Sequence, residues 1–176
     1  MAIELTPEQE QQVQERLFEK EKELREQFDG HLSKEMLWLL DMMKEHFGKE
    51  ALQVYLKATG EKKRAQWKKI AEDIGDDSIE ALIVQCWGPS LEEARKYGFE
   101  YTKEEAADGI QIRCTKCPIY ETAERNGTME YLLMNCKLES FMVEGFNPNI
   151  GFSLTKMLSQ GDDHCNHFYF YKDKSK

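Results

Sequence analysis

The chain has 176 residues, of which 40% are hydrophobic, so it is long enough to bury the core of one domain and too apolar to be wholly disordered. Its 24 lysine and arginine residues stand against 33 aspartate and glutamate residues; the net charge of −9 argues against binding nucleic acid or an anionic membrane as the main activity. No apolar run approaches the roughly 18 residues of a membrane span, and the start lacks the pattern of a signal peptide, so we expect a cytoplasmic protein.

Residues 6 to about 98 are predicted to be almost wholly helical. The first helix opens with a capping box, in which Thr6 is the cap, Pro7 takes the first helical position and Gln9 completes the box. This helix is very polar over residues 7–29 and carries a thin apolar seam made of Val13, Leu17, Leu24 and Phe28, before Gly30 ends it. Such a helix packs along one narrow line, either against the body of the protein or against the second subunit of a homodimer.

Further helices are expected in the same region. One is predicted over about 34–47, between Ser33 and Gly48, and others near 49–58, 61–74, 78–87 and 91–97. A basic patch runs through Lys62, Lys63 and Arg64 to Lys68 and Lys69. Because the chain is acidic and the patch has acidic neighbours, we interpret it as a solvated helix face and not as a nucleic-acid site.

The second half of the chain alternates apolar and polar residues with a period of two. A hairpin is predicted over 99–117 with its turn near Gly109, then helices over 118–125 and 128–143, then a second hairpin with strands over 152–159 and 165–171. The sequence therefore predicts an α+β fold, with a helical region over 1–98 and, over 99–176, an α+β module on a small antiparallel sheet; we expect the two to pack as one unit.

The chain has five cysteines, an odd number. In a reducing compartment we expect them to be free thiols or metal ligands in preference to disulfides. Alternation along a strand places Cys114 on the face of Ile110 and Ile112, where we expect it in the core, and Cys117 on the other face or at the strand end. Cys117 precedes Pro118 at a helix N-terminus, which favours its thiolate. The CxxC spacing also leaves open a redox pair of Cys114 and Cys117.

Two further cysteines have acidic or basic side chains near them in the sequence. Glu139 follows Cys136 by one helical turn and lies on the same side of the helix. A cysteine in the middle of a helix is, however, more often a buried packing residue than a reactive one. Cys165 opens the last strand, and His167 shares its face of that strand, just after the turn Gly161-Asp162-Asp163-His164. A turn rich in Asp and Gly usually has no function beyond reversing the chain. The cysteine, the histidine and the two aspartates could nevertheless bind a metal, or provide a base beside a thiol.

Taken together, these motifs resemble those of the L-2-amino-thiazoline-4-carboxylic acid hydrolase family over residues about 80–172. They are Arg113-Cys-Thr-Lys-Cys-Pro118, Tyr131 to Glu139, Glu144-Gly-Phe-Asn-Pro148, Leu154-Thr-Lys156 and Gly161-Asp-Asp-His-Cys165-Asn-His-Phe-Tyr169. A fainter likeness runs to vinyl-reductase-type small-molecule-binding domains, which end in a similar hairpin and hold zinc through cysteines.

The family resemblance implies a hydrolase that opens a small cyclic amidine, converting the thiazoline amino acid to N-carbamoyl-cysteine. Cys117, Cys136 and Cys165 match the motif cysteines of the family, Glu139 its acidic position, and Asp162 and Asp163 its turn acids. The substrate carboxylate needs a donor, for which Arg113 and Lys156 are the candidates.

Two mechanisms and a second function stay open. In one mechanism a thiolate, Cys136 or Cys117, attacks the ring carbon while Glu139, Asp163 or His167 transfers protons. In the other, Cys117, Cys136 and Cys165 bind zinc, and a zinc-bound water attacks. We favour the thiolate because the motifs contain no dense pair of metal ligands. The other function is that of a non-catalytic sensor of the vinyl-reductase type, binding a small molecule or zinc.

Overall fold

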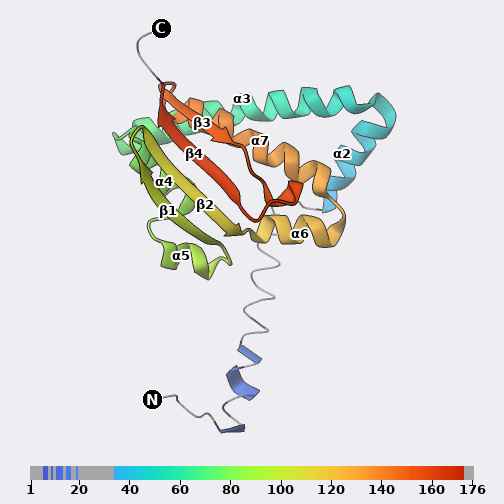
Figure 1. The fold of residues 1–176 in the computed structure, drawn as a ribbon. Coiled ribbons are helices and arrows are strands. Elements are labelled where there is room, and N and C mark those ends of the chain that lie inside the picture. The colour runs from blue at the N-terminus through green and yellow to red at the C-terminus, as the bar shows by residue number, and fades with distance from the viewer. Residues whose placement is uncertain are drawn as a thin grey trace.

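The computed structural model describes residues 34–172 and, before them, residues 6, 7, 9, 11–13, 15, 16 and 19. From residue 34 onward the elements in chain order are α2 (Lys34–Phe47), α3 (Lys49–Ile74), α4 (Ile79–Trp87), α5 (Leu91–Lys96), β1 (Glu100–Ala106), β2 (Gly109–Lys116), α6 (Pro118–Asn126), α7 (Met129–Phe146), β3 (Ile150–Leu154), the 3-10 helix η2 (Leu158–Gln160) and β4 (Cys165–Tyr171). This arrangement confirms the α+β fold class (Figure 1).

The capping box at the start of the chain is confirmed. The backbone N–H of Thr6 donates to Gln9 Oε1 at 2.9 Å, and the N–H of Gln9 donates to Thr6 Oγ1 at 3.3 Å. The expected seam residues Leu17, Leu24 and Phe28, the stop at Gly30 and the cap at Ser33 lie outside the described residues.

The two segments predicted at 49–58 and 61–74 are wrong as separate helices, because α3 runs without interruption through Gly60. The reason is tertiary. A Cβ at Gly60 would lie 2.7 Å from the Phe141 ring of α7, and a Cβ at Gly145 of α7 would lie 2.2 Å from the carbonyl oxygen of Arg64. The two glycines therefore let α3 and α7 approach closely, and packing outweighs the low helix propensity of glycine.

The strands form one antiparallel sheet in the order β1-β2-β4-β3. Both predicted hairpins are confirmed, and they join through β2 and β4, which place Ile110 opposite Tyr169, Ile112 opposite His167 and Cys114 opposite Cys165. The first strand of the second hairpin ends at Leu154 instead of Ser159, because residues 158–160 form η2.

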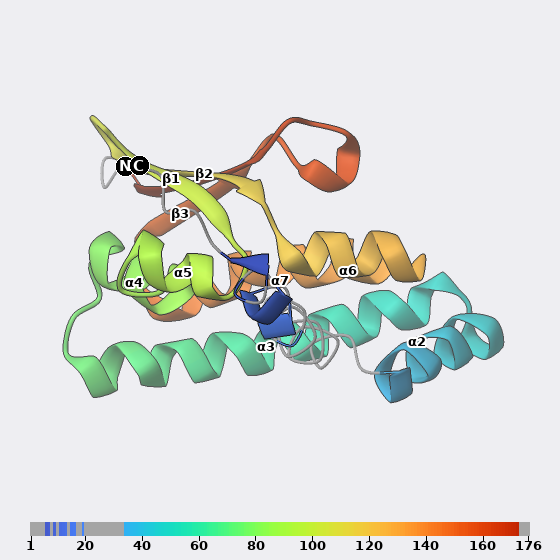
Figure 2. The same ribbon diagram turned by 90° about the horizontal axis from the view of Figure 1, so that it is seen from below.

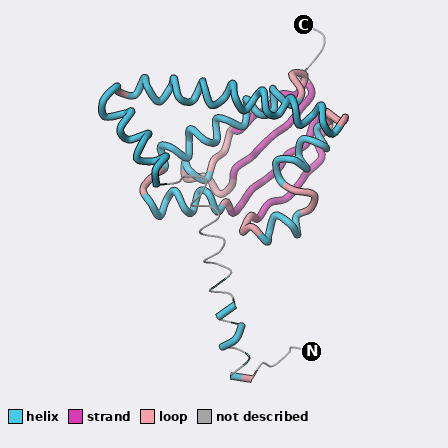
Figure 3. Tube along the Cα trace, turned by 180° about the vertical axis from the view of Figure 1, so that it is seen from behind, coloured by secondary structure: helices cyan, strands magenta, loops and turns pink. Residues whose placement is uncertain are grey.

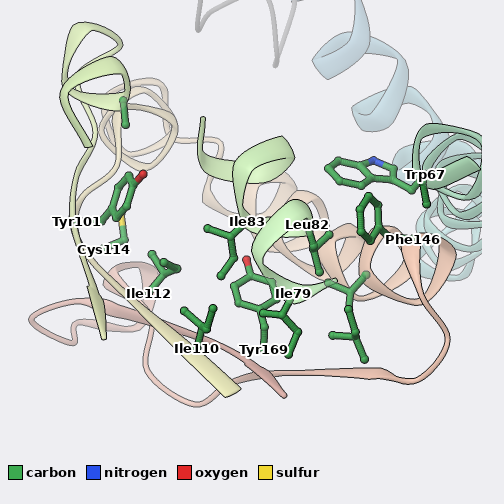
Figure 4. Close-up of a cluster of buried hydrophobic side chains, with 14 residues drawn as sticks. Trp67, Ile79, Leu82, Ile83, Tyr101, Ile110, Ile112, Cys114, Phe146 and Tyr169 are labelled. Atoms are coloured by element: carbon green, nitrogen blue, oxygen red, sulfur yellow. The ribbon is translucent and has the colours of Figure 1, made fainter. Parts of the chain in front are cut away.

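The helices cover one face of this sheet. Figure 2 shows α4, α5 and α7 beneath the strands and α3 beyond them, and the view from behind in Figure 3 shows helices in front of the magenta strands. The main core joins both halves of the chain, and Figure 4 shows Tyr169 of β4 among Ile79, Leu82 and Ile83 of α4. Cys114 is buried in this core, as expected. Among the described residues, no helix is long and apolar enough to cross a membrane.

The close approach of α3 and α7 makes a prediction. Gly145→Ala should lower the free energy of unfolding by about 1–3 kcal/mol, because the new methyl meets backbone that cannot turn away. Gly60→Ala should cost less, because its methyl meets the side chain of Phe141, and alanine itself favours a helix by about 1 kcal/mol. Urea denaturation of both variants measures this, and a Gly145→Ala protein as stable as the wild type would contradict the packing.

Candidate functional site

A cavity of about 480 Å³ lies between the covered face of the sheet and the helices. Its polar and sulfur-bearing walls come from elements far apart in the sequence: Lys63, Cys86, Glu93, Cys114, Cys117, Asn135, Cys136, Glu139, Ser159, Cys165 and His167. All five cysteines of the chain therefore face one space, together with one carboxylate and one imidazole from the predicted site.

Strand β4 supplies the central pair. Cys165 and His167 are two residues apart on this strand, so both side chains lie on the face that the helices cover. Cys165 stands opposite Cys114 of β2, and His167 stands opposite Ile112 of β2 and Leu154 of β3. The flanking strands thus hold both groups against the cavity.

Glu139 reaches His167 from helix α7. His167 Nδ1 lies 3.0 Å from Glu139 Oε2 and 3.2 Å from Oε1, and the two side chains are only 10% and 16% exposed. The hydroxyl of Tyr169 also donates to Glu139, and Trp87 Nε1 donates to the Tyr169 hydroxyl at 2.9 Å. The rings of Trp87 and His167 pack in a T-shaped pair, with 4.8 Å between the ring centroids. Two partners, His167 and Tyr169, therefore hold this buried carboxylate, and Trp87 supports both of them.

The imidazole of His167 is protonated at neutral pH. Burial lowers its pKa, but the negative charge of Glu139 and the hydrogen bonds to Cys165 and Glu139 outweigh burial and raise the pKa from 6.5 to about 9. The Cys165 thiol is two residues away on the same face of β4, and its Sγ accepts the backbone N–H of Leu158 at 3.3 Å. Cys165, His167 and Glu139 therefore lie in a row, in which a hydrogen bond joins His167 to Glu139.

The other cysteines are in surroundings that disfavour their thiolates. Burial raises the pKa of Cys117 to about 11 and that of Cys136 to about 12, and it also raises the pKa values of Cys86 and Cys114. The backbone N–H groups of Ile119 and Tyr120, at the start of α6, do lower the pKa of Cys117. Burial raises the pKa of Cys117 by more than these N–H groups lower it. The prediction that the helix N-terminus favours the Cys117 thiolate is therefore wrong in its net direction.

Three predicted site residues lie outside the cavity. Asp163 is 64% exposed and is bound by Arg113 Nη2 at 2.9 Å, by Lys156 Nζ at 3.7 Å and by His164 Nδ1 at 2.7 Å. The hydrogen bond from His164, with the nearby charges of Lys156 and Arg113, lowers the pKa of Asp163. Both cations expected to bind the substrate thus face a carboxylate of the protein, and none of the three residues lines the cavity.

The zinc site expected from the cysteines stays a prediction. Cys117, Cys136 and Cys165 line the same cavity, but within the described ranges no three His, Cys, Asp or Glu side chains are grouped as metal ligands. We therefore derive no zinc chemistry for this cavity. The cysteines of the CxxC segment are both free thiols.

Sequence reasoning missed Tyr169, Trp87 and Lys63. The alternation that relates Cys165 to His167 also reaches Tyr169, so the strand pattern could have found it. Trp87 carries no local signal, because its contact with β4 joins residues far apart in the chain. Lys63 belongs to the basic patch that we interpreted as solvated, but it lines the cavity.

Comparison with known proteins bears on this site. The sequence model of the family described as L-2-amino-thiazoline-4-carboxylic acid hydrolase matches residues 12–169, a range that includes every residue of the cavity. Neither a search of curated proteins nor a search of solved structures finds a match to this chain, so the expected likeness to vinyl-reductase-type domains stays a prediction.

The buried ion pair predicts a pH-dependent stability. The folded-state pKa of His167 is raised, so the contribution of its protonation is fully present below pH 6.5 and is lost as the pH rises through about 9. The destabilisation caused by His167→Asn should therefore be largest below pH 6.5 and shrink by about 3 kcal/mol toward pH 9, as measured by urea denaturation.

His46→Asn is the control for this measurement, because His46 is an exposed histidine near the end of α2. Its effect on the free energy of unfolding should stay small at every pH. A destabilisation by His167→Asn that is constant with pH, or grows toward pH 9, would contradict the assigned ion pair.

Proposed function

The chain belongs to the L-2-amino-thiazoline-4-carboxylic acid hydrolase family, and we propose that it opens a cyclic amidine ring with Cys165 as the nucleophile. The family is one of hydrolases, and the observation that supports this assignment is the row of Cys165, His167 and Glu139 in one cavity. A nucleophile, a base beside it and a group that orients the base are the parts that covalent hydrolysis needs.

Cys165 is preferred over the other thiols because of its neighbours. The His167 imidazole shares its face of β4 and can transfer protons beside it, and the N–H of Leu158 donates a hydrogen bond to its sulfur. For Cys117 and Cys136, burial raises the pKa to about 11 and about 12. The favoured thiolate mechanism is thus kept, while the role expected for Cys136 or Cys117 passes to Cys165.

The first half of the reaction opens the ring. The Cys165 thiolate adds to the ring carbon between sulfur and nitrogen, and the electron pair of the carbon–nitrogen double bond moves to nitrogen. When that pair returns, the bond from this carbon to the ring sulfur breaks, and His167 gives its proton to the leaving sulfur. The product of this half is an isothiourea joined to Cys165.

The second half restores the enzyme. His167, now neutral, accepts a proton from water as the oxygen adds to the same carbon, and Cys165 then leaves as a thiolate. For L-2-amino-thiazoline-4-carboxylate the sum is the addition of one water, which gives N-carbamoyl-cysteine. Glu139 holds the imidazole through Nδ1 and stabilises its charged form, the role of the acid in a catalytic triad.

The assignment predicts that Cys165→Ser lowers kcat at least about a thousandfold, because the residue forms the covalent intermediate. The measurement is mass-spectrometric detection of N-carbamoyl-cysteine after incubation with L-2-amino-thiazoline-4-carboxylate, with the zinc content of the same sample recorded. Cys136→Ser is the matched control, since this residue lines the same cavity, and it should keep activity within about tenfold of the wild type.

Three results would overturn the assignment. Loss of turnover in Cys136→Ser with retention in Cys165→Ser would move the nucleophile to α7. Turnover that disappears with a chelator and returns with zinc would favour the metal-bound water. Binding of a small molecule without turnover in any variant would favour the sensor.

A further inference from the structure

We propose that the native substrate is a cyclic amidine with an apolar substituent larger than the bare aminothiazoline ring, and that Lys63 binds its carboxylate. The inference rests on the proposed hydrolase function for the reacting end of the molecule. For the rest of the molecule it rests on three properties of the cavity: its size, its apolar walls and the one lysine among its described lining residues, for which no described residue provides an ion pair.

The first property is size. Cavities of roughly 300–1,000 Å³ bury most of a drug-sized ligand. This one, at about 480 Å³, falls within that range. L-2-Amino-thiazoline-4-carboxylate is a single five-membered ring with an amino and a carboxyl group, so it would leave much of the cavity to water or unfilled.

The second property is the chemistry of the walls. The rest of the lining is largely aromatic and aliphatic, and its members include Trp87, Phe99, Leu138, Met142, Leu154 and Leu158. Burying an apolar group gains about 25 cal/mol per Å² of surface removed from water. Such walls would therefore bind a hydrocarbon or aromatic substituent more tightly than the bare ring.

The third property is the charge of Lys63. It is the only lysine or arginine among the described residues that line the cavity, and no ion pair joins it to another described residue. Its neighbour Arg64 is held by Glu61 and Glu144, and Arg113 and Lys156 are held by Asp163. The cation left for a carboxylate in this space is therefore Lys63, because His167 is already paired with Glu139.

These properties define how the substrate lies. Cys165 of β4, Lys63 of α3 and apolar side chains of α4 and α7 all line this cavity. A substrate with its amidine carbon at the Cys165 sulfur and its carboxylate at the Lys63 ammonium would place an apolar substituent against Trp87 and Met142. The bare ring carries no substituent that could contact these walls.

Two compounds test the size and apolar walls: L-2-amino-thiazoline-4-carboxylate and its 5-phenyl derivative. The wild-type kcat/KM should be at least about tenfold higher for the phenyl compound, the discrimination that an apolar pocket supplies. A kcat/KM that is equal or higher for the bare ring would overturn the proposed substrate class.

Lys63→Met tests the carboxylate contact. It should raise KM for the phenyl compound about 10–100-fold and change kcat less than about threefold, because the carboxylate is bound alike in the ground state and the transition state. Lys62→Met is the matched control, since Lys62 is exposed on the same helix and does not line the cavity; its KM should equal that of the wild type. The carboxamide analogue of the phenyl compound should not distinguish Lys63→Met from the wild type.

Calorimetric binding of the phenyl compound to Cys165→Ser separates this inference from the proposed function. Affinity that falls when Lys63→Met is added to Cys165→Ser supports the carboxylate contact, even if no variant shows turnover and the hydrolase assignment fails. Turnover in the wild type with the same KM in Lys63→Met and Lys62→Met would overturn the role of Lys63 while leaving the hydrolase assignment intact.

Discussion

The structure depends on one buried ion pair, which joins His167 of strand β4 to Glu139 of helix α7. Burying two opposite charges costs free energy unless each also finds hydrogen bonds. Here the Tyr169 hydroxyl binds the same carboxylate, and Trp87 binds the Tyr169 hydroxyl in turn. The cost of burial is thus met by a network that ties the sheet to α4 and α7, and the same network holds the imidazole beside Cys165.

The five cysteine thiols that line the cavity have different surroundings. Cys117 and Cys136 are close to one another and to Cys165, yet burial without a cationic partner raises their pKa values. Cys165 differs because the strand places it two residues from an imidazole that carries charge at neutral pH. In the mechanism that we propose, position on the strand, more than burial, therefore selects the reacting sulfur. The proposed mechanism uses this difference between Cys165 and the other thiols and includes no metal.

Local patterns predict much of this protein, and long-range packing accounts for the rest. Period-two alternation predicts both hairpins, the burial of Cys114 and the shared face of Cys165 and His167, because neighbouring residues decide these features. The continuity of α3 through Gly60 depends on Phe141 of another helix. The pairing of Arg113 with Asp163 and the contact of Lys63 with the cavity likewise join distant residues, so no local motif reveals them.

The most direct test of the central claim is the alkylation rate of each cysteine in the native protein, measured by peptide mass spectrometry with a small uncharged chloroacetamide at neutral pH. The thiolate is the reacting form, so the rates rank the five sulfurs by ionisation and access. We predict that Cys165 reacts first and that Glu139→Gln, which removes the charge that keeps His167 protonated, slows this reaction at Cys165 alone. Faster alkylation of Cys117 or Cys136, or a Cys165 rate unchanged in Glu139→Gln, would contradict it.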